Sequence, residues 1–178
     1  GWRAEVAGLC AGNSRCVLAL CAGLASMLLE FSGIESGGIN LKGSSSTGKT
    51  TALAAAASLF GGPSYVNRWR ATSNGLESLA ALHNDTLLIL DELAQVDPRE
   101  AGEIAYMLAN GQGKQRSART GGAKARQSLR LLFLSAGEIG LAQHMADGGK
   151  KAKAGQEVRL VDLDADAGKG LGLFDTLH

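Results

Sequence analysis

The stretch Gly43-Ser44-Ser45-Ser46-Thr47-Gly48-Lys49-Thr50 matches the pattern GxxxxGK[ST] at every fixed position. Residues 39–42 before it are expected to form a short strand, and the alanine-rich residues 48–60 a helix. At such a junction the glycines let backbone N–H groups wrap phosphates, and the helix N-terminus adds partial positive charge. We therefore predict a phosphate-binding loop in which Lys49 contacts the β- and γ-phosphates of a nucleotide.

The same loop is expected to supply part of a metal site. Nucleotide contacts are predicted for consecutive residues of the loop and the helix start: Gly43, Ser44, Ser45, Ser46, Thr47, Gly48, Lys49, Thr50 and Thr51. Thr50 offers a hard oxygen to Mg²⁺, a cation that keeps waters and substrate phosphates as its other ligands. Since the sequence has no Asn-Lys-x-Asp motif for reading guanine, ATP with Mg²⁺ is the expected pair of ligands.

Two carboxylates follow the next apolar run. Residues 86–90 are almost continuously apolar, as expected for a strand covered on both faces, and Asp91-Glu92 comes directly after them. This arrangement resembles a Walker B motif. Asp91 is the second predicted metal contact, and Glu92 is expected to orient or deprotonate the attacking water. A Glu at this position favours hydrolysis over phosphoryl transfer to a small molecule.

Two further residues complete the predicted catalytic set of Lys49, Glu92, Ser135 and Arg159. Ser135 ends the apolar run 129–135, which corresponds to the sensor position of ring ATPases, where a hydroxyl contacts the γ-phosphate or the water. The alternative is a hydroxyl that is satisfied locally at a strand end. Arg159 is the candidate arginine finger, which stabilises negative charge in the transition state, often from a neighbouring subunit. The alternative is an ordinary strand-edge arginine paired with an acid such as Asp162.

Residues 111–130, called the basic insertion below, contain cations and no acid. Lys114 and Arg116 are two residues apart, as are Lys124 and Arg126, and Thr120-Gly121-Gly122-Ala123 separates the pairs like a hairpin turn. We predict a β-hairpin that contacts the backbone of single-stranded DNA largely without sequence preference, since it has no aromatic residue for base stacking. The alternative is a solvated loop. The expected nucleic-acid contacts are Lys114, Arg116, Arg119, Lys124 and Arg126.

Alternating strands and helices predict an α/β fold of three layers, a P-loop NTPase of the AAA+ or superfamily-3 type, with a mainly parallel five-stranded sheet and the inserted hairpin. A length of 178 residues suits a single domain. We divide it into a leading helical segment (1–35), an ATPase core (36–165) and a tail (166–178), and expect it to be a fragment of a longer protein. The net charge of +1 excludes a global field that would drive binding to polyanions, so any such contact must be local.

The leading segment is expected to contain a buried helix over 14–31, with an apolar stripe formed by Val17, Leu20, Cys21, Leu24, Ala25 and Leu28. Its uncharged run, residues 16–29, is shorter than the roughly 18 to 20 residues that span a bilayer. No signal peptide pattern is present, and the three cysteines fit a reduced state. The sequence therefore predicts a cytoplasmic protein without a membrane partner.

Together these segments resemble the domain of unknown function 927 family over nearly the whole chain. The resemblance is carried by Gly1-Trp2-Arg3, Ser45-Ser46-Thr47-Gly48-Lys49-Thr50-Thr51, Trp69-Arg70-Ala71-Thr72, Asn74-Gly75-Leu76-Glu77, Leu90-Asp91-Glu92, Met107-Leu108-Ala109-Asn110-Gly111 and Gly155-Gln156-Glu157-Val158-Arg159. Members occur in phage, plasmid and integrative-element proteins, often near primase-like domains, and are similar to superfamily-3 and MCM-like ring helicases. The resemblance implies a role in replication of mobile DNA.

The leading functional hypothesis is an ATP-driven translocase or helicase that works on DNA as a homo-oligomeric ring, with a primase domain or partner nearby. The alternative is a protein-remodelling or loader-type AAA+ ATPase without unwinding activity. Remodelling ATPases normally carry an aromatic and hydrophobic pair in their pore loops, which the basic insertion lacks. Because P-loop cores serve many motors, the fold by itself does not choose between these hypotheses.

Overall fold

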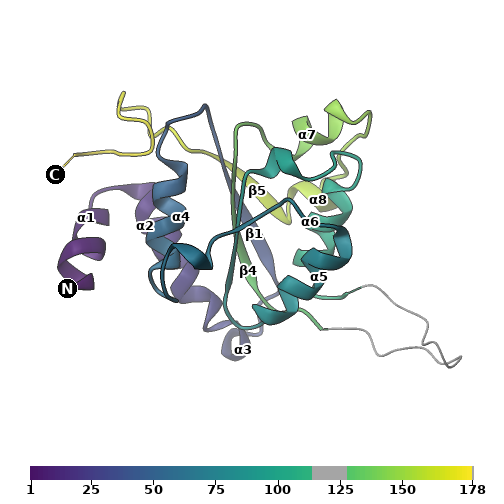
Figure 1. Cartoon of the computed structure of the whole chain (residues 1–178), viewed down its shortest axis with the longest axis horizontal. Helices are drawn as coiled ribbons and strands as arrows, with labels where there is room; N and C mark the ends of the chain where they lie inside the picture. Colours follow the sequence, from purple (N-terminus) through teal and green to yellow (C-terminus); the bar gives the residue numbers. More distant parts are fainter. Residues whose placement is uncertain (114–127, 178) are drawn as a thin grey trace, which may run out of the picture.

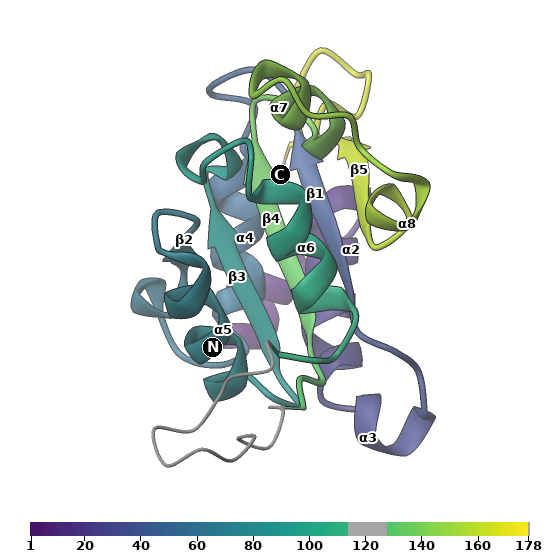
Figure 2. The same ribbon diagram turned by 90° about the vertical axis from the view of Figure 1, so that its right-hand side faces the viewer.

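The computed structural model describes residues 1–113 and 128–177. Five strands form one sheet: β1 (Gly37–Lys42), β2 (Asn67–Arg68), β3 (Leu87–Asp91), β4 (Leu132–Gly137) and β5 (Leu160–Asp164). All of their pairings are parallel, in the order β2-β3-β4-β1-β5 (Figure 2). The fold class predicted from the sequence, an α/β fold with a five-stranded parallel sheet, is confirmed.

Helices cover both faces of this sheet, which gives three layers (Figure 1). One face carries α2 (Ser14–Ser26) and α4 (Lys49–Ala57), and the other carries α5 (Ser73–Leu82) and α6 (Ala101–Ala109). The shorter helical segments are η1 (Arg3–Ala7), α1 (Gly8–Cys10), α3 (Leu29–Ser32), η2 (Pro63–Tyr65), η3 (Leu93–Gln95), α7 (Leu141–Asp147) and α8 (Ala154–Glu157).

Alternation along the strands divides the core into two clusters, because successive side chains point to opposite faces of a sheet. In β3, Leu87 and Ile89 pack with α2 and α4, whereas Leu88 and Leu90 pack with α5 and α6. All four are fully buried. A strand covered on both faces is apolar throughout and lacks the alternation of apolar and polar residues seen in a half-exposed strand. The continuous apolar run 86–90 therefore predicted β3 correctly.

The predicted apolar stripe of the leading helix is wrong by about one position. Only Leu20 of that stripe is buried, while Val17, Leu24 and Leu28 are exposed. The helix also ends at Ser26 rather than continuing to residue 31, and α3 follows as a separate turn. The face that packs against the core carries Cys16 and the small residues Ala19, Ala22, Gly23 and Ser26.

Close packing explains this face of α2. A Cβ atom on Gly23 would lie 2.6 Å from Cδ1 of Leu59, which follows the end of α4. Helix α4 itself buries Ala52, Ala56 and Ala57. Small side chains on both helices let them approach closely, and larger ones would overpack the contact. Within the described part of the chain, none of the helices combines the length and the apolar character needed to cross a membrane.

Candidate nucleotide-binding site

One cavity of about 320 Å³ lies at the carboxyl edge of the sheet. It is lined by the phosphate-binding loop and by residues that follow β3 and β4: Ser45, Ser46, Thr47, Gly48, Lys49, Thr50, Thr51, Asp91, Glu92, Gly137 and Glu138. Ligands of parallel α/β sheets bind at this edge, outside the carboxyl ends of the strands. The structure therefore brings the predicted loop and both predicted carboxylates to one place, which we call the loop cavity.

The loop turns sharply into α4 through two residues in left-handed backbone conformations. Gly48 has φ 94° and precedes the first residue of the helix, and Ser46 has φ 64°. The carbonyl of Gly48 accepts from the backbone N–H of Thr51 at 2.9 Å, which starts the helix. A side chain at position 48 would be strained in this conformation, so the second glycine of the motif has a backbone role.

The Lys49 ammonium is held by carbonyl oxygens of its own loop. Nζ donates to the carbonyls of Gly43 and Ser44, both at 2.7 Å. The hydroxyl of Thr47 donates to the Ser44 carbonyl at 3.0 Å and tightens the same turn. Lys49, the only cation among the described residues that line the loop cavity, is therefore fixed over the loop. There it can exchange carbonyl oxygens for phosphate oxygens.

The two carboxylates stand at the end of β3. Asp91 is its last residue, and Glu92 follows with φ 63° and ψ 73°. The backbone N–H of Glu92 donates to Oδ1 of Asp91 at 3.0 Å. A left-handed backbone is costly for a residue other than glycine, and such strain gathers at functional sites. The strained turn fixes both acidic residues beside the phosphate-binding loop.

Thr50 and Asp91 line the same cavity and carry the hard oxygens that Mg²⁺ prefers. No group of three or more His, Cys, Asp or Glu residues suited to a metal occurs among residues 1–113 and 128–177. A cation there would depend on a few protein oxygens together with phosphates and water. The residues present thus fit Mg²⁺ bound jointly with a nucleotide.

Ser135 is not among the side chains brought to the cavity. It is fully buried and its Oγ accepts from Nε1 of Trp69 at 2.9 Å. Strand β4 continues for two residues to Gly137, so the residues at its carboxyl end are Gly137 and Glu138. The predicted strand end was too early, and Glu138 was missed for that reason. Its signal in the sequence was an acidic residue three positions after the apolar run 129–135.

Arg159 precedes β5 and lies at the amino-terminal edge of the sheet, opposite the loop cavity. In the pairing of β1 with β5, Gly38 faces Leu160 and Lys42 faces Asp164. The length of the strand therefore separates Arg159 from the phosphate-binding loop of the same chain, about 13 Å at 3.3 Å per residue. Arg159 cannot serve the nucleotide site of its own chain in this arrangement.

The Arg159 guanidinium makes local contacts and no ion pair among the described residues. It lies 4.7 Å from the ring centre of Tyr106, and Nη1 donates to the Gly155 carbonyl at 3.2 Å. The suggested pairing with Asp162 is wrong, because that carboxylate accepts from Nδ2 of Asn40 at 2.7 Å and from the backbone N–H of Leu141 at 3.2 Å.

The predicted nucleic-acid contacts Lys114, Arg116, Arg119, Lys124 and Arg126 all lie outside the described residues. The two flanks of the basic insertion are described, and they run antiparallel. Gln112 and Ser128 form an antiparallel bridge, and the backbone N–H of Leu129 donates to the Gly111 carbonyl at 2.8 Å. The chain thus leaves and re-enters the described fold at one point, and the predicted β-hairpin itself lies outside the described residues.

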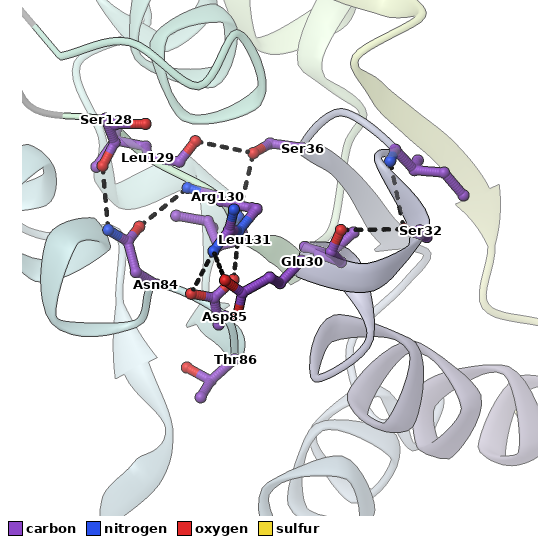
Figure 3. Close-up of polar contacts among 12 residues, drawn as sticks. Glu30, Ser32, Ser36, Asn84, Asp85, Thr86, Ser128, Leu129, Arg130 and Leu131 are labelled. Atoms are coloured by element: carbon purple, nitrogen blue, oxygen red, sulfur yellow. Dashed lines mark hydrogen bonds and ion pairs between the residues drawn. The ribbon is translucent and has the colours of Figure 1, made fainter.

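A polar network, called the anchor network, holds the second flank (Figure 3). Arg130 forms ion pairs with Asp85 and Glu30, and its backbone N–H donates to Oδ1 of Asn84 at 2.9 Å. The Ser36 hydroxyl donates to the Leu129 carbonyl at 3.3 Å and accepts from the backbone N–H of Leu131 at 3.1 Å. Arg130, counted with the basic insertion in the sequence, is therefore part of its attachment to the fold.

The carboxyl-terminal tail contacts the phosphate-binding loop, which the sequence did not indicate. The backbone N–H of Leu173 donates to the Thr47 carbonyl at 2.7 Å, and the Leu173 side chain is fully buried. Asp175 then accepts from the Ser14 hydroxyl and backbone N–H at 2.7 Å, and these bonds lower the pKa of its carboxyl. The tail thereby joins the loop to the start of α2.

A phosphate-binding loop after β1, an acidic pair at the end of β3 and a five-stranded parallel sheet define the fold as that of a P-loop NTPase. The family model "Domain of unknown function (DUF927)" matches residues 1–128, and the chain belongs to that family. A comparison with curated proteins found no match.

A solved structure titled "SCCmec type IV Cch - active helicase" is similar to this chain, with a TM-score of 0.70 and 23% sequence identity. The match covers 97% of this chain and 34% of the other, so the chain spans about a third of that protein's length. At this identity the likeness concerns the fold.

Proposed function

We propose that this chain is an ATPase domain whose ATP hydrolysis drives translocation on DNA or its unwinding, as part of a ring helicase of mobile-element replication. The observation that carries the proposal is the loop cavity, where one small space is lined by Lys49, Thr50, Asp91 and Glu92. Family membership and the fold shared with a protein titled as a helicase support the biological setting.

The residues would divide the work as follows. The loop N–H groups and Lys49 bind the phosphates, and the fixed αL turn at Gly48 presents the start of α4 to them. Thr50 and Asp91 would hold Mg²⁺, which supplies charge neutralisation on the phosphates when bound. Glu92 orients the attacking water and accepts its proton. The water oxygen bonds to the γ-phosphorus, and the bond to the β–γ bridging oxygen breaks with its electron pair leaving on ADP.

The missing catalytic cation would come from a second subunit. Among the described residues, Lys49 is the only Lys or Arg that lines the loop cavity. Since Arg159 lies at the opposite edge of the sheet, it would reach a nucleotide only in a neighbouring copy. A ring places each subunit's edge against the next subunit's site, and this arrangement would make hydrolysis depend on assembly. The basic insertion would then contact single-stranded DNA, and a primase domain or partner would act on the same DNA.

The test is ATP hydrolysis by the full-length protein, with and without single-stranded DNA. We expect DNA to stimulate turnover and Lys49→Ala to lower it at least about a hundredfold, as removal of a phosphate-binding charge does. The double change Lys114→Ala with Arg116→Ala should remove only the stimulation by DNA. Lys150→Ala with Lys151→Ala, two exposed cations outside the basic insertion, is the charge-matched control.

Turnover that depends on Lys49 but ignores DNA would retain the ATPase and favour the remodelling or loader alternative. An unwinding assay on a forked duplex then separates a helicase from a translocase.

A further inference from the structure

Glu138 is a third acidic side chain at the loop cavity, beside Asp91 and Glu92. It follows the last residue of β4, the strand between β3 and β1, and so stands next to the strand that leads into the phosphate-binding loop. Its side chain is exposed, and no hydrogen bond or ion pair of its carboxylate occurs among the described residues. Among the described residues, the Glu138 carboxylate therefore lines the cavity and has no hydrogen-bond or ion-pair partner that would explain its position structurally.

The backbone before Glu138 is fixed to the phosphate-binding loop. The Gly137 carbonyl accepts from the backbone N–H of Gly43 at 3.1 Å. A Cβ atom on Gly137 would lie 3.0 Å from Cβ of Leu93, in the turn that follows Glu92. The residue before Glu138 thus contacts both the phosphate-binding loop and the turn after Glu92.

The backbone after Glu138 is fixed by a polar pair formed by Asn40 and Asp162. Asn40, fully buried in β1, donates from Nδ2 to Oδ1 of Asp162 at 2.7 Å and to the Ile139 carbonyl at 3.5 Å. The other oxygen of Asp162 accepts from the backbone N–H of Leu141. A Cβ atom on Gly140 would overlap the same carboxylate, so this turn packs directly on Asp162. Glu138 therefore stands between two fixed points rather than in a free loop.

We propose that Glu138 is a catalytic residue of this ATPase, where it accepts a hydrogen bond from the attacking water beside the γ-phosphate; this rests on the proposed function. A water has two hydrogens, and attack on phosphorus needs a free lone pair. With Glu92 and Glu138 each accepting one hydrogen, a lone pair is left for the γ-phosphorus. Glu92 takes the proton, Glu138 keeps its charge and holds the remaining O–H, and ADP leaves with the electron pair of the broken bond.

A negative charge at this place also affects binding. It repels the γ-phosphate of ATP, which ADP lacks. Glu138→Gln removes the charge and keeps the size of the side chain and one acceptor oxygen. We therefore expect this variant to bind ATP more tightly relative to ADP, by about threefold or more for charges some 7 Å apart in a water-rich site. Turnover should fall about tenfold, since a hydrogen bond to a neutral amide oxygen is weaker than one to a carboxylate.

The experiment measures both quantities on the full-length protein. Binding of fluorescent ATP and ADP analogues gives the ratio of the two dissociation constants, and a phosphate-release assay gives turnover. Glu100→Gln is the matched control, because Glu100 is exposed at the start of α6 and does not line the cavity. Glu138→Asp tests position, since it keeps the charge and shortens the side chain, and should lose turnover without the gain in ATP binding.

The outcomes separate the inference from the proposed function. If the wild type binds ATP through Lys49 and Glu138→Gln changes neither turnover nor the ATP-to-ADP ratio, the inference is overturned and the ATPase proposal stands. If the wild type does not bind ATP, or Lys49→Ala binds it equally well, both are overturned. A fall in turnover together with a raised ATP preference, absent from Glu100→Gln, supports the role of Glu138.

Discussion

Arg130 and Asp85 join the amino-terminal ends of β4 and β3 through two parallel hydrogen bonds (Figure 3). Nη2 of Arg130 donates to Oδ2 of Asp85 at 3.0 Å, Nε donates to Oδ1, and the same guanidinium lies 3.5 Å from a carboxylate oxygen of Glu30. These bonds from Arg130 lower the pKa of the Asp85 carboxyl. The pair lies where the basic insertion re-enters the fold, while Glu92 and Glu138 follow the other ends of the same two strands.

Replacing Asp85 with Asn should destabilise the protein in a pH-dependent way. Asp85 has φ 60°, and Asn tolerates this left-handed backbone as well as Asp does, so the change removes charge without adding strain. At pH 7 we expect a loss of about 1 kcal/mol, the upper end for partly exposed ion pairs. Because the folded pKa is lowered, the stabilisation is present above the unfolded pKa and is lost as the pH falls through the folded pKa.

Urea unfolding of the wild type and Asp85→Asn at pH 7, 5 and 3 measures this effect. The difference in the free energy of unfolding should be similar at pH 7 and 5 and shrink below about pH 4, where Asp side chains protonate. A difference that stays constant to pH 3 would show that the charge of Asp85 does not matter.

The strained backbone of Glu92 predicts a conflict between stability and activity. With φ 63° at this position, Glu92→Gly should relieve the left-handed strain and raise stability by about 1 kcal/mol, while removing the carboxylate proposed to activate water. Glu92→Gln should lose turnover to the same extent but gain no stability. Thermal unfolding and phosphate release for the two variants test this, and equal melting temperatures would argue that the turn carries no strain.

The contact between the tail and the phosphate-binding loop should matter for nucleotide affinity. Gly172 has φ 63°, and a Cβ atom there would lie 2.8 Å from the Thr47 carbonyl. Gly172→Ala should therefore push the tail from the loop and weaken ATP binding, with a stability loss of about 1 to 2 kcal/mol from the left-handed backbone. Gly170→Ala is the control, since Gly170 has φ 71° but nothing within 4 Å of its added Cβ. Both should lose stability, and only Gly172→Ala should lose affinity.

The sequence predicted those parts of the site that depend on local pattern. The loop motif and the apolar run before Asp91 each correspond to one continuous segment, so their spacing in the sequence was enough to locate them. In the structure, residues of both segments line the loop cavity. The prediction that Ser135 ends the strand was wrong because β4 continues to Gly137. Where a buried strand ends is determined by its neighbours rather than by its own residues. Glu138 was missed for the same reason, and the tail was missed because its contact with Thr47 joins segments that are far apart in the chain.

The leading helix shows a second limit of sequence patterns. Hydrophobicity ranks Leu24 and Leu28 above Ala19 and Gly23, so the larger residues were expected to face the core. In the structure the smaller residues face the core, because only small side chains fit where α2 packs closely against α4. Burial in a tight helix pair follows side-chain volume as well as polarity.

The position of Arg159 predicts that two inactive variants restore each other's activity. Lys49→Ala should remove nucleotide binding from its own subunit and leave a normal Arg159, whereas Arg159→Ala should leave the phosphate-binding loop intact. Because Arg159 and the loop cavity lie at opposite ends of the strands of one sheet, a mixed ring of the proposed kind would contain some interfaces in which an intact loop faces an intact Arg159.

For this pair of variants, we expect Lys49→Ala alone to be at least about a hundredfold less active than the wild type. Arg159→Ala alone should be at least about a thousandfold less active, as for loss of an arginine finger. Mixed in equal amounts, they should recover a clear fraction of wild-type turnover, measured by phosphate release. Arg159→Lys distinguishes an arginine finger from a packing role, because Lys keeps the charge but not the planar guanidinium. Compared with Arg159→Ala, it should recover stability more than turnover. If the mixture is no more active than its components, Arg159 does not act between subunits, and its role is then limited to local contacts such as those with Tyr106 and Gly155.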